Sequence, residues 1–382
     1  MPEPDVAAPE GAAVTPYVPA YGTASLAELP GSLLAALGLP GTGTLGLEPV
    51  RKVCLFLVDG LGAELLAAHP EAAPFLSSRP RRTLTAGFPS STPTSLATLG
   101  TGSPPGEHGM VGIQMAVPGE GRLLNCLRWT APGPAVDPET WQPAPTVFQR
   151  LAALGADPVY VAPAMFDGTG LTRAVYRGVR YRAAETPAER VEAVRRSMRE
   201  SAYVTVYYGD VDRMGHLKGW GSPEWLDQVA VADRMAERIA EALPPGSALY
   251  VTADHGMINV GDRVDVDHRP DLREGVLMIG GDARARHLYT RPGAAPDVAA
   301  VWREALAGRA WVVTREEAAG AGWFGPRVRP EWLARIGDVM AVPYGDCAIV
   351  ASETEPVEAS LVGNHGSLTP AEQNVPLVEI RS

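Results

Sequence analysis

Seven side chains in this 382-residue sequence have the types and the placement that metal-assisted chemistry requires. Six of them are acidic or imidazole groups, and they lie beside or close to a glycine or just behind a run of apolar residues. Mixed carboxylate and imidazole sets bind zinc, and less often manganese or iron. Each member alone also fits a helix cap or a solvated loop residue, so only the combination predicts a site. The set consists of Asp59, Thr92, Asp212, His216, Asp254, His255 and His365.

Thr92 is the hydroxyl of the set. It follows the segment GFPSS, where a turn is expected to end and a helix to begin. Free backbone N–H groups and the helix dipole at such an end favour an anion. A threonine there is by default an N-cap residue. Beside two divalent ions its hydroxyl becomes a nucleophile candidate, because a bound cation lowers the pKa of the hydroxyl.

Alternating strand-like and helix-like segments must position these side chains. The alternation predicts an α/β fold with a mostly parallel sheet sandwiched by helices. Ligand sites in such sheets form beyond the carboxyl ends of the strands, which is where Asp59 and Asp254 stand. Strands are expected at Val53–Val58, Pro158–Ala162, Ala202–Tyr208 and Ala248–Ala253, and helices at Ala63–Ala68, Thr92–Leu99, Thr146–Leu154, Ala188–Glu200 and Trp225–Leu243.

The composition divides the chain into four parts. Residues 1–22 are rich in Ala, Pro, Glu and Gly and predict a flexible N-terminal arm. Residues 23–262 predict the first part of the core. Residues 263–344 have weak periodicity with many Arg, Pro, Gly and Trp residues, and they predict a smaller inserted cap. Residues 345–382 predict the final part of the core, which returns at the strand Cys347–Ala351 and carries His365.

Charge and hydropathy exclude several classes of partner. The net charge of −11 would repel a phosphate backbone, so no nucleic acid polymer is expected to bind. No apolar stretch of about 18 residues is present, and the N-terminus lacks the features of a signal peptide. We therefore expect a cytoplasmic protein without a membrane partner. The three cysteines have no paired spacing and predict no disulfide framework, while Cys54 and Cys347 lie in apolar runs that predict buried thiols.

Five motifs in this order resemble the type I phosphodiesterase/nucleotide pyrophosphatase branch of the alkaline phosphatase superfamily. They are VDGLG, the Thr92 segment ending in TGSPPGEHG, DRMGH, TADHGM and NHG. The resemblance covers roughly residues 53–366 and is weakest in the cap. It implies an alkaline phosphatase-like core with two divalent metal ions, zinc before manganese. One ion would be bound by Asp59, Thr92, Asp254 and His255, and the other by Asp212, His216 and His365.

The resemblance also implies an activity, the hydrolysis of a small-molecule phosphoester through a phosphothreonine intermediate on Thr92. Thr92 lies nine residues before Thr101 and sixteen before His108, which matches the family's nucleophile spacing. His108 itself is expected to be structural. Ile113 stands where the family has an asparagine that holds a phosphoryl oxygen, and the neighbouring Gln114 is a candidate substitute. This departure, with the unusual Pro-Thr-Ser after Thr92, weakens the transfer of nucleotide specificity.

Three alternatives remain open from the sequence. A phosphomonoesterase or a phosphonate hydrolase could use the same site, and a protein that binds metal or ligand could have lost catalysis. A monoesterase usually adds a cation for the extra phosphate charge, and Arg173, Arg213 and Arg269 are candidates. A sulfatase is disfavoured, because it needs a Cys or Ser in a CxPxR-type sequence that Thr92-Pro93-Thr94 does not supply. The leaving group and the oligomeric state stay open.

Overall fold

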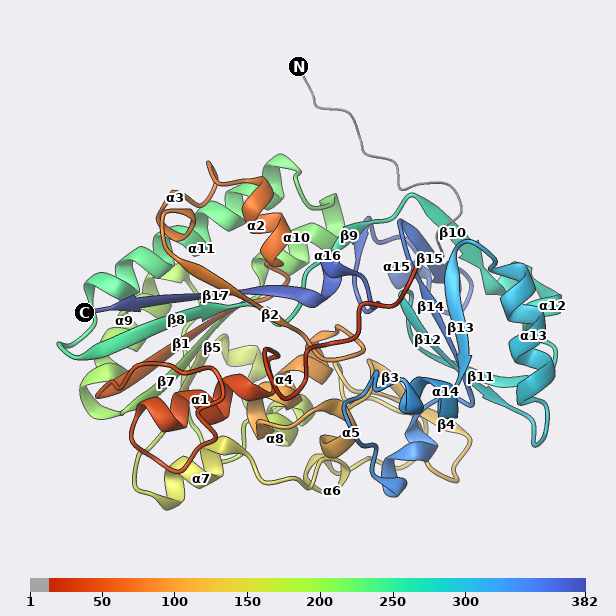
Figure 1. Cartoon of the computed structure of the whole chain (residues 1–382), viewed down its shortest axis with the longest axis horizontal. Coiled ribbons are helices and arrows are strands. Elements are labelled where there is room, and N and C mark those ends of the chain that lie inside the picture. Colours follow the sequence, from red (N-terminus) through yellow and green to blue (C-terminus); the bar gives the residue numbers. More distant parts are fainter. Residues whose placement is uncertain (1–13) are drawn as a thin grey trace.

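A seven-stranded sheet, in the order β2-β17-β8-β1-β7-β5-β6, forms the main layer of the protein (Figure 1). The structure is a computed structural model, and it describes residues 14–382. Five neighbouring strands are parallel, while β17 runs antiparallel to both β8 and β2. The predicted mostly parallel α/β sheet is therefore confirmed. The strands are β1 (Lys52–Val58), β2 (Arg81–Thr85), β5 (Val159–Ala162), β6 (Arg180–Ala183), β7 (Tyr203–Tyr208), β8 (Ser247–Thr252) and β17 (Asn374–Arg381).

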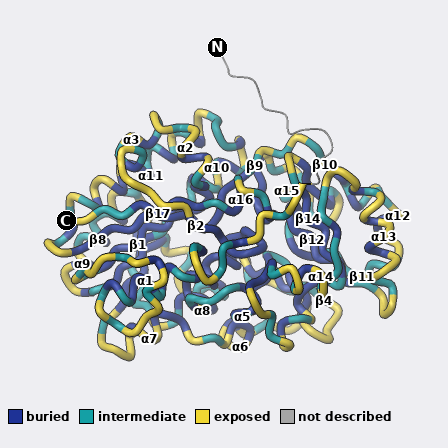
Figure 2. The backbone as a smooth tube through the Cα atoms, viewed as in Figure 1, coloured by how far each residue is buried: buried dark blue, intermediate teal, exposed yellow. Residues whose placement is uncertain are grey.

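Helices cover both faces of this sheet, as Figure 1 shows. Because each face is covered, the central strand β1 is apolar after its first residue, and only this first residue, Lys52, is not buried. Figure 2 shows the same pattern, with buried strands inside a more exposed outer layer. The helices of eight or more residues and those that flank the sheet are α1 (Glu28–Ala36), α2 (Ala63–Ala68), α4 (Thr92–Thr101), α7 (Val147–Ala153), α8 (Gly170–Val175), α9 (Pro187–Glu200), α10 (Asp210–Lys218), α11 (Pro223–Glu241) and α13 (Ala295–Ala305).

A second, four-stranded antiparallel sheet lies within residues 263–344, the segment predicted to be a cap. Its order is β11-β12-β14-β13, and α13 packs against it around the buried Trp302. We use the name cap for this sheet with α13. The weak periodicity of the sequence had hidden these strands, because they are short and alternate with glycine-rich turns. The strands are β11 (Val276–Asp282), β12 (Ala285–Thr290), β13 (Ala310–Thr314) and β14 (Val339–Pro343).

A strand is present at the predicted return to the core, Cys347–Ala351, but it does not join the main sheet. Strand β15 (Cys347–Val350) pairs with β10 (Asp262–Asp265), and the chain rejoins the main sheet only with β17. An apolar run indicates that a strand is buried, not which layer buries it. Here Cys347 and Ile349 belong to the apolar cluster of the cap.

The predicted arm, residues 1–22, divides at residue 14. Residues 1–13 lie outside the described residues. The following stretch is held against the rest of the molecule rather than loose. The Tyr17 N–H donates to the Leu368 carbonyl (2.8 Å), and the Tyr21 hydroxyl both accepts from the Phe88 N–H and donates to the Trp323 carbonyl.

Shorter elements complete the described chain. No helix within residues 14–382 combines the length and the apolar character needed to cross a bilayer. Cys54, Cys126 and Cys347 are all buried and free, as the lack of paired spacing predicted. The remaining elements are α3 (Pro74–Ser77), α5 (Pro105–His108), α6 (Pro138–Trp141), α12 (Pro270–Arg273), α14 (Arg315–Gly320), α15 (Pro356–Ala359), α16 (Pro370–Gln373), β3 (Gln114–Val117), β4 (Arg122–Asn125), β9 (Ile258–Asn259) and β16 (Gly363–Asn364).

Candidate active site

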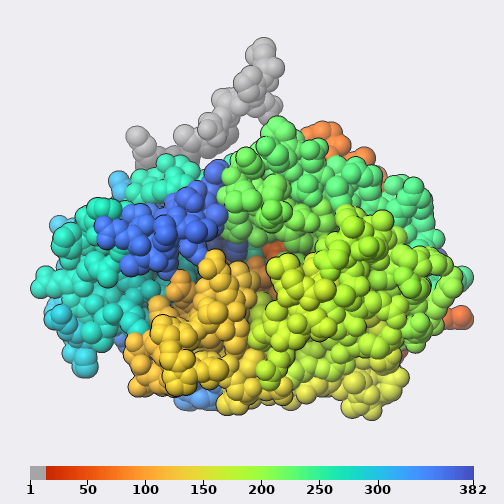
Figure 3. Space-filling model, turned by 180° about the vertical axis from the view of Figure 1, so that it is seen from behind, coloured from red at the N-terminus to blue at the C-terminus, as the bar shows by residue number. Residues whose placement is uncertain are grey.

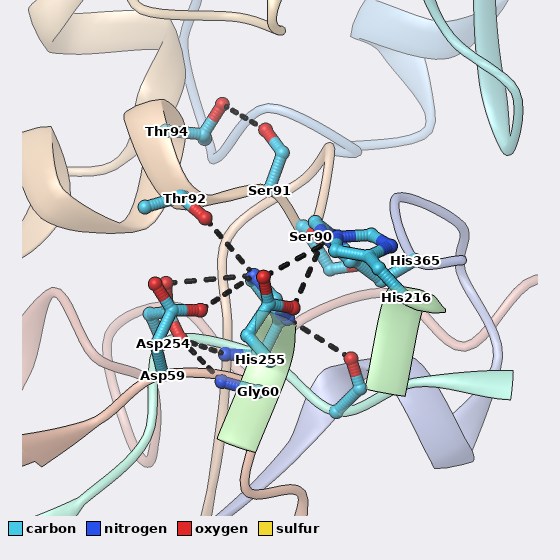
Figure 4. A network of polar contacts seen from close by, with 12 residues as sticks. Asp59, Gly60, Ser90, Ser91, Thr92, Thr94, His216, Asp254, His255 and His365 are labelled. Atoms are coloured by element: carbon cyan, nitrogen blue, oxygen red, sulfur yellow. Dashed lines mark hydrogen bonds and ion pairs between the residues drawn. The ribbon is translucent and has the colours of Figure 1, made fainter. Parts of the chain in front are cut away.

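Three of the predicted ligands meet where two central strands end (Figure 4). Asp59 directly follows β1, and Asp254 and His255 follow β8, the parallel neighbour of β1, after one intervening residue, Ala253. The His255 Nε2 atom lies 3.4 Å from a carboxylate oxygen of Asp59 and 3.4 Å from one of Asp254. All three side chains are buried. Adjacent parallel strands thus bring two carboxylates and one imidazole into a single buried group.

A second group is formed by α10 and the loop that carries His365. Asp212 and His216 are four residues apart in α10 and so project from one face of the helix. The His216 Nε2 atom lies 3.3 Å from Asp212 Oδ2 and 3.2 Å from His365 Nε2. Asp212 also lies within reach of the first group, because ligand atoms of Asp59, Asp212 and His255 all fall within 4.8 Å of one another. The two groups are therefore adjacent and share Asp212.

Gly60 permits this close approach of the two groups. Its φ of +72° lies in the left-handed region, and a Cβ atom there would stand 2.9 Å from the Asp212 Cα. The Gly60 N–H donates to Asp254 Oδ1 over 3.1 Å. The Asp-Gly pair after β1 therefore supplies one ligand, orients a second and makes room for a third.

Each of the three histidines turns its Nε2 atom toward the site, because a backbone carbonyl holds its Nδ1 atom. The Nδ1 atoms of His216, His255 and His365 lie 2.8 Å, 2.9 Å and 2.8 Å from the carbonyls of Gly363, Gly256 and Ser90. A carbonyl only accepts, so Nδ1 carries the proton and Nε2 presents a lone pair. Histidines that bind metals are commonly oriented in this way.

The side chains around the carboxylates of the site do not supply enough positive charge to balance them. One oxygen each of Asp59, Asp212 and Asp254 is buried and has no hydrogen-bond partner in the described chain. Burial, together with the charges of Asp254 and Asp212, raises the pKa of Asp59 well above its ordinary value. Burial likewise raises the pKa of Asp254. A divalent cation would relieve both effects, so these residues fit a metal.

Thr92 lies at the edge of the first group. It is the first residue of α4, it is 8% exposed, and its hydroxyl oxygen lies 3.2 Å from His255 Nε2. Its backbone N–H makes no hydrogen bond within residues 14–382. Ser90, two residues before Thr92, is bound to the His365 loop, because its N–H donates to the Gly366 carbonyl (3.1 Å) and its hydroxyl accepts from the Gly366 N–H (3.2 Å). The start of α4 and that loop are thus positioned together.

Tyr207 belongs to the site although no motif pointed to it. Its hydroxyl donates to Asp59 Oδ2 over 2.5 Å. Burial, followed by the charges of Asp59 and Asp254, raises the pKa of Tyr207 well above its ordinary value, so the hydroxyl keeps its proton. The only sequence signal was the position of Tyr207 near the end of β7, the strand beside β1.

The other candidates have partners outside the seven predicted residues. The Gln114 side-chain amide donates to Glu355 (2.6 Å), and none of its hydrogen bonds in the described chain reaches the site. His108 is fully buried and bonded to Thr98, in line with the structural role expected for it. Each of the three candidate arginines forms an ion pair with a nearby carboxylate: Arg173, Arg213 and Arg269 pair with Asp137, Asp210 and Asp271.

The site opens toward solvent beside α10. The side chains of His216 and Asp212 are 22% and 15% exposed, whereas those of Asp254 and His255 are fully buried. Figure 3 shows a hollow on the face opposite to that of Figure 1, where segments drawn in amber, green and blue meet. The green border contains α10.

Comparison with known proteins identifies the family of the chain. The family model described as type I phosphodiesterase/nucleotide pyrophosphatase matches residues 53–368, which include all seven residues. The chain belongs to this family. The protein is thus a phosphoester hydrolase with an alkaline phosphatase-like fold, and a small-molecule phosphoester is the substrate class that fits the family. No curated protein matches the chain.

Solved structures share the fold at low sequence identity. Phosphonoacetate hydrolase from Sinorhizobium meliloti 1021, in complex with phosphonoacetate, has a TM-score of 0.67 and 21% identity, over 86% of this chain and 90% of that chain. Murine ectonucleotide pyrophosphatase/phosphodiesterase 5 has a TM-score of 0.65 and 18% identity, over 85% and 87% of the two chains. The human form of the latter has a TM-score of 0.64 and 18% identity, over 86% and 87%. These neighbours support the fold class predicted from the sequence.

Proposed function

We propose that this family member is a two-metal hydrolase of the phosphodiesterase/nucleotide pyrophosphatase type, acting through a phosphothreonine intermediate on Thr92. The observation that carries the proposal is the position of the Thr92 hydroxyl. It lies 3.2 Å from His255 Nε2, at the N-terminus of α4, beside a buried set of carboxylates with unpaired oxygens. A hydroxyl placed there is suited to attack a phosphorus atom, because the helix end favours the phosphoryl oxygens.

The two ligand groups support the division into two cation sites. We assign Asp59, Thr92, Asp254 and His255 to the first site, and Asp212, His216 and His365 to the second. Zinc is our first choice of metal and manganese the second, because the set mixes imidazole nitrogens with carboxylates. When bound, a pair of cations lowers the pKa of a hydroxyl and stabilises negative charge on the attacking and leaving oxygens.

The residues of the chain account for the remaining steps. The Thr92 hydroxyl gives its proton to solvent, and its oxygen forms a bond to phosphorus while the bond from phosphorus to the leaving oxygen breaks. The leaving group takes a proton from solvent and departs as an alcohol. The Thr92 N–H makes no hydrogen bond within residues 14–382, so it is available to donate to a phosphoryl oxygen. Water then attacks the same phosphorus atom, which releases a phosphomonoester and restores the threonine.

Phosphonate hydrolysis is a second candidate for the same site. Ile113 replaces the asparagine that the family uses to hold a phosphoryl oxygen, and Gln114 is engaged with Glu355 instead. The contacts expected for a nucleotide substrate are therefore incomplete. Phosphonoacetate, the ligand of one structural neighbour, is an appropriate first phosphonate to test.

A substrate screen combined with trapping of the intermediate tests the proposal. Zinc-loaded protein should hydrolyse an aryl phosphodiester, and quenching with acid during turnover should leave the phosphoryl group, with its second ester still attached, on a peptide containing Thr92. Faster turnover of an aryl phosphomonoester or of phosphonoacetate would replace the diester assignment while keeping the nucleophile. Turnover of any of these esters by Thr92→Ala at the wild-type rate would refute the nucleophile.

A further inference from the structure

A fully buried ion pair joins the cap to the core close to the proposed second metal site. Arg284 stands in the turn between β11 and β12, and Glu372 in α16; both are 0% exposed. The guanidinium makes two parallel bonds to the carboxylate, Nη2 to Oε2 over 2.6 Å and Nε to Oε1 over 3.0 Å. Nη1 donates to the Cys347 carbonyl. Neither residue lies in a motif that the sequence singled out.

Glu372 holds the His365 loop with its side chain. The carboxylate accepts from the Ser367 N–H (3.1 Å) and from the Thr369 hydroxyl (2.5 Å), and Ser367 is two residues beyond His365. The loop of the first ligand group is held differently. Its Gly256 N–H donates over 2.9 Å to the backbone carbonyl of Glu372, not to the carboxylate. A change of the Glu372 side chain should therefore loosen the His365 loop, which Ser90 still holds, and leave Gly256 bound.

The cap contacts the His365 loop closely at Gly366. The Arg284 N–H donates to Asp282 Oδ1 over 3.0 Å, and that oxygen faces Gly366, the residue after His365. A Cβ atom on Gly366 would lie 2.3 Å from Asp282 Oδ1, and the φ of Gly366 is +138°. The turn that carries Arg284 is thus in direct contact with the ligand loop, and Arg284 binds Glu372, whose carboxylate holds the same loop.

We propose that Arg284 and Glu372 form a positioning pair, through which the cap holds the His365 loop and sets the cation affinity of the second ligand group. The inference rests on the proposed two-metal function. A buried ion pair adds little net stability, because the loss of hydration offsets much of the attraction between the charges. Its geometric effect is larger, because the carboxylate fixed by Arg284 is the acceptor for the backbone of the loop.

Paired substitutions test this role without leaving a buried charge unpaired. Arg284→Met with Glu372→Leu removes both the ion pair and the acceptor for Ser367, while Arg284→Met with Glu372→Gln keeps an acceptor oxygen. Each pair is combined with Asp254→Asn, which disables the first group, or with His216→Ala, which disables the second. Zinc affinity of the metal-free proteins is measured by calorimetry, and folding is checked by circular dichroism.

With the first group disabled, the Leu pair should weaken the remaining zinc affinity by about 10- to 100-fold, the usual effect of removing a partner that orients a ligand. With the second group disabled, the same pair should change the zinc affinity by less than about threefold. The Gln pair should fold if the Leu pair does not, and it should recover most of the second-site affinity. Arg315→Met, which breaks the Arg315–Asp338 pair inside the cap, is the matched control and should leave both affinities unchanged.

Equal weakening of both sites, or no weakening of the second, would overturn the positioning role. An intermediate affinity for the Gln pair supports it, whereas a Gln pair as weak as the Leu pair contradicts it. The outcome for the unsubstituted protein separates this inference from the proposed function. Binding of fewer than two zinc ions there refutes the two-metal site itself, whereas two ions with an unaffected Leu pair refute only the inference.

Discussion

Replacing Tyr207 by Phe should selectively weaken the first cation site. The substitution deletes one oxygen, the donor that lies 2.5 Å from Asp59 Oδ2, and leaves the buried ring in place. A hydrogen bond to a charged group contributes about 1.5–3 kcal/mol. Since about 1.4 kcal/mol corresponds to a tenfold change in an equilibrium constant, the first zinc ion should bind roughly 10- to 100-fold more weakly. Asp59 would also gain a proton more readily, because the bond from Tyr207 lowers its pKa against the effect of burial.

Zinc titration of the metal-free protein by calorimetry measures this effect, and the adjacent residue supplies the control. Tyr208→Phe removes the same atom from the next position of β7, where the hydroxyl donates to Gln228 of α11 (2.6 Å) rather than to the site. It should leave both zinc affinities unchanged. The reasoning fails if Tyr207→Phe binds both ions with wild-type affinity, or if Tyr208→Phe weakens the first ion equally. Loss of the second ion alone would mean that Tyr207 supports the second ligand group, which contradicts the reasoning.

Three further predictions concern the nucleophile, the metal and the pH. Thr92→Ala should lower kcat by at least about a thousandfold, because it removes the attacking oxygen, whereas Thr92→Ser should keep part of the activity. Steady-state kinetics measures these changes, and elemental analysis should show that both variants keep their metal content. Removal of metal by a strong chelator should abolish activity and lower Tm, because Asp59, Asp212 and Asp254 then repel one another, and zinc should restore both; activity unaffected by the chelator would contradict the metal site. In the metal-free protein, burial lowers the pKa of His216, but the Asp212 carboxylate raises it by more, so this pKa is raised from 6.5 to about 9. A histidine whose pKa is raised on folding stabilises the fold fully at pH values below the pKa of the unfolded state, and this contribution is lost as the pH rises through about 9. The Tm of the metal-free protein should therefore fall between pH 6.5 and 9, and it should fall less in His216→Gln.

The central elements could be predicted from the sequence because their patterns are strong and local. The apolar run of β1 and the amphipathic helices α9 and α11 were located within two residues of their observed ends. Strands β2, β6 and β17 were missed. Their sequences alternate or carry several arginines, as in RRTLT and RYRA, so they resemble exposed segments. Only the neighbouring strands, distant in the sequence, make them part of the sheet.

The site residues could be predicted as a set because five motifs constrained one another. Their roles depend on contacts that a motif does not contain. Asp212 was expected to bind only the second ion, but from its place in α10 its ligand atoms reach both groups. Tyr207 and Glu372 were not found, because each acts through a partner more than 80 positions away in the chain, Asp59 and Arg284 respectively. Such partners become visible only when the sheet and the cap are assembled.

The arrangement explains why the cap can influence chemistry that occurs in the core. The His365 loop bonds to Ser90 just before the helix that begins with Thr92, and the same loop is held by Glu372 and Arg284. A displacement of the cap would therefore shift a ligand of the second cation together with the start of the nucleophile helix. In the proposed mechanism, Asp212, His216 and His365 would hold a cation that stabilises the leaving oxygen while Thr92 attacks, so a shift of either part would disturb the line of attack. Substitutions at the contact between cap and loop should thus lower kcat more than they raise KM, even where they touch no substrate atom.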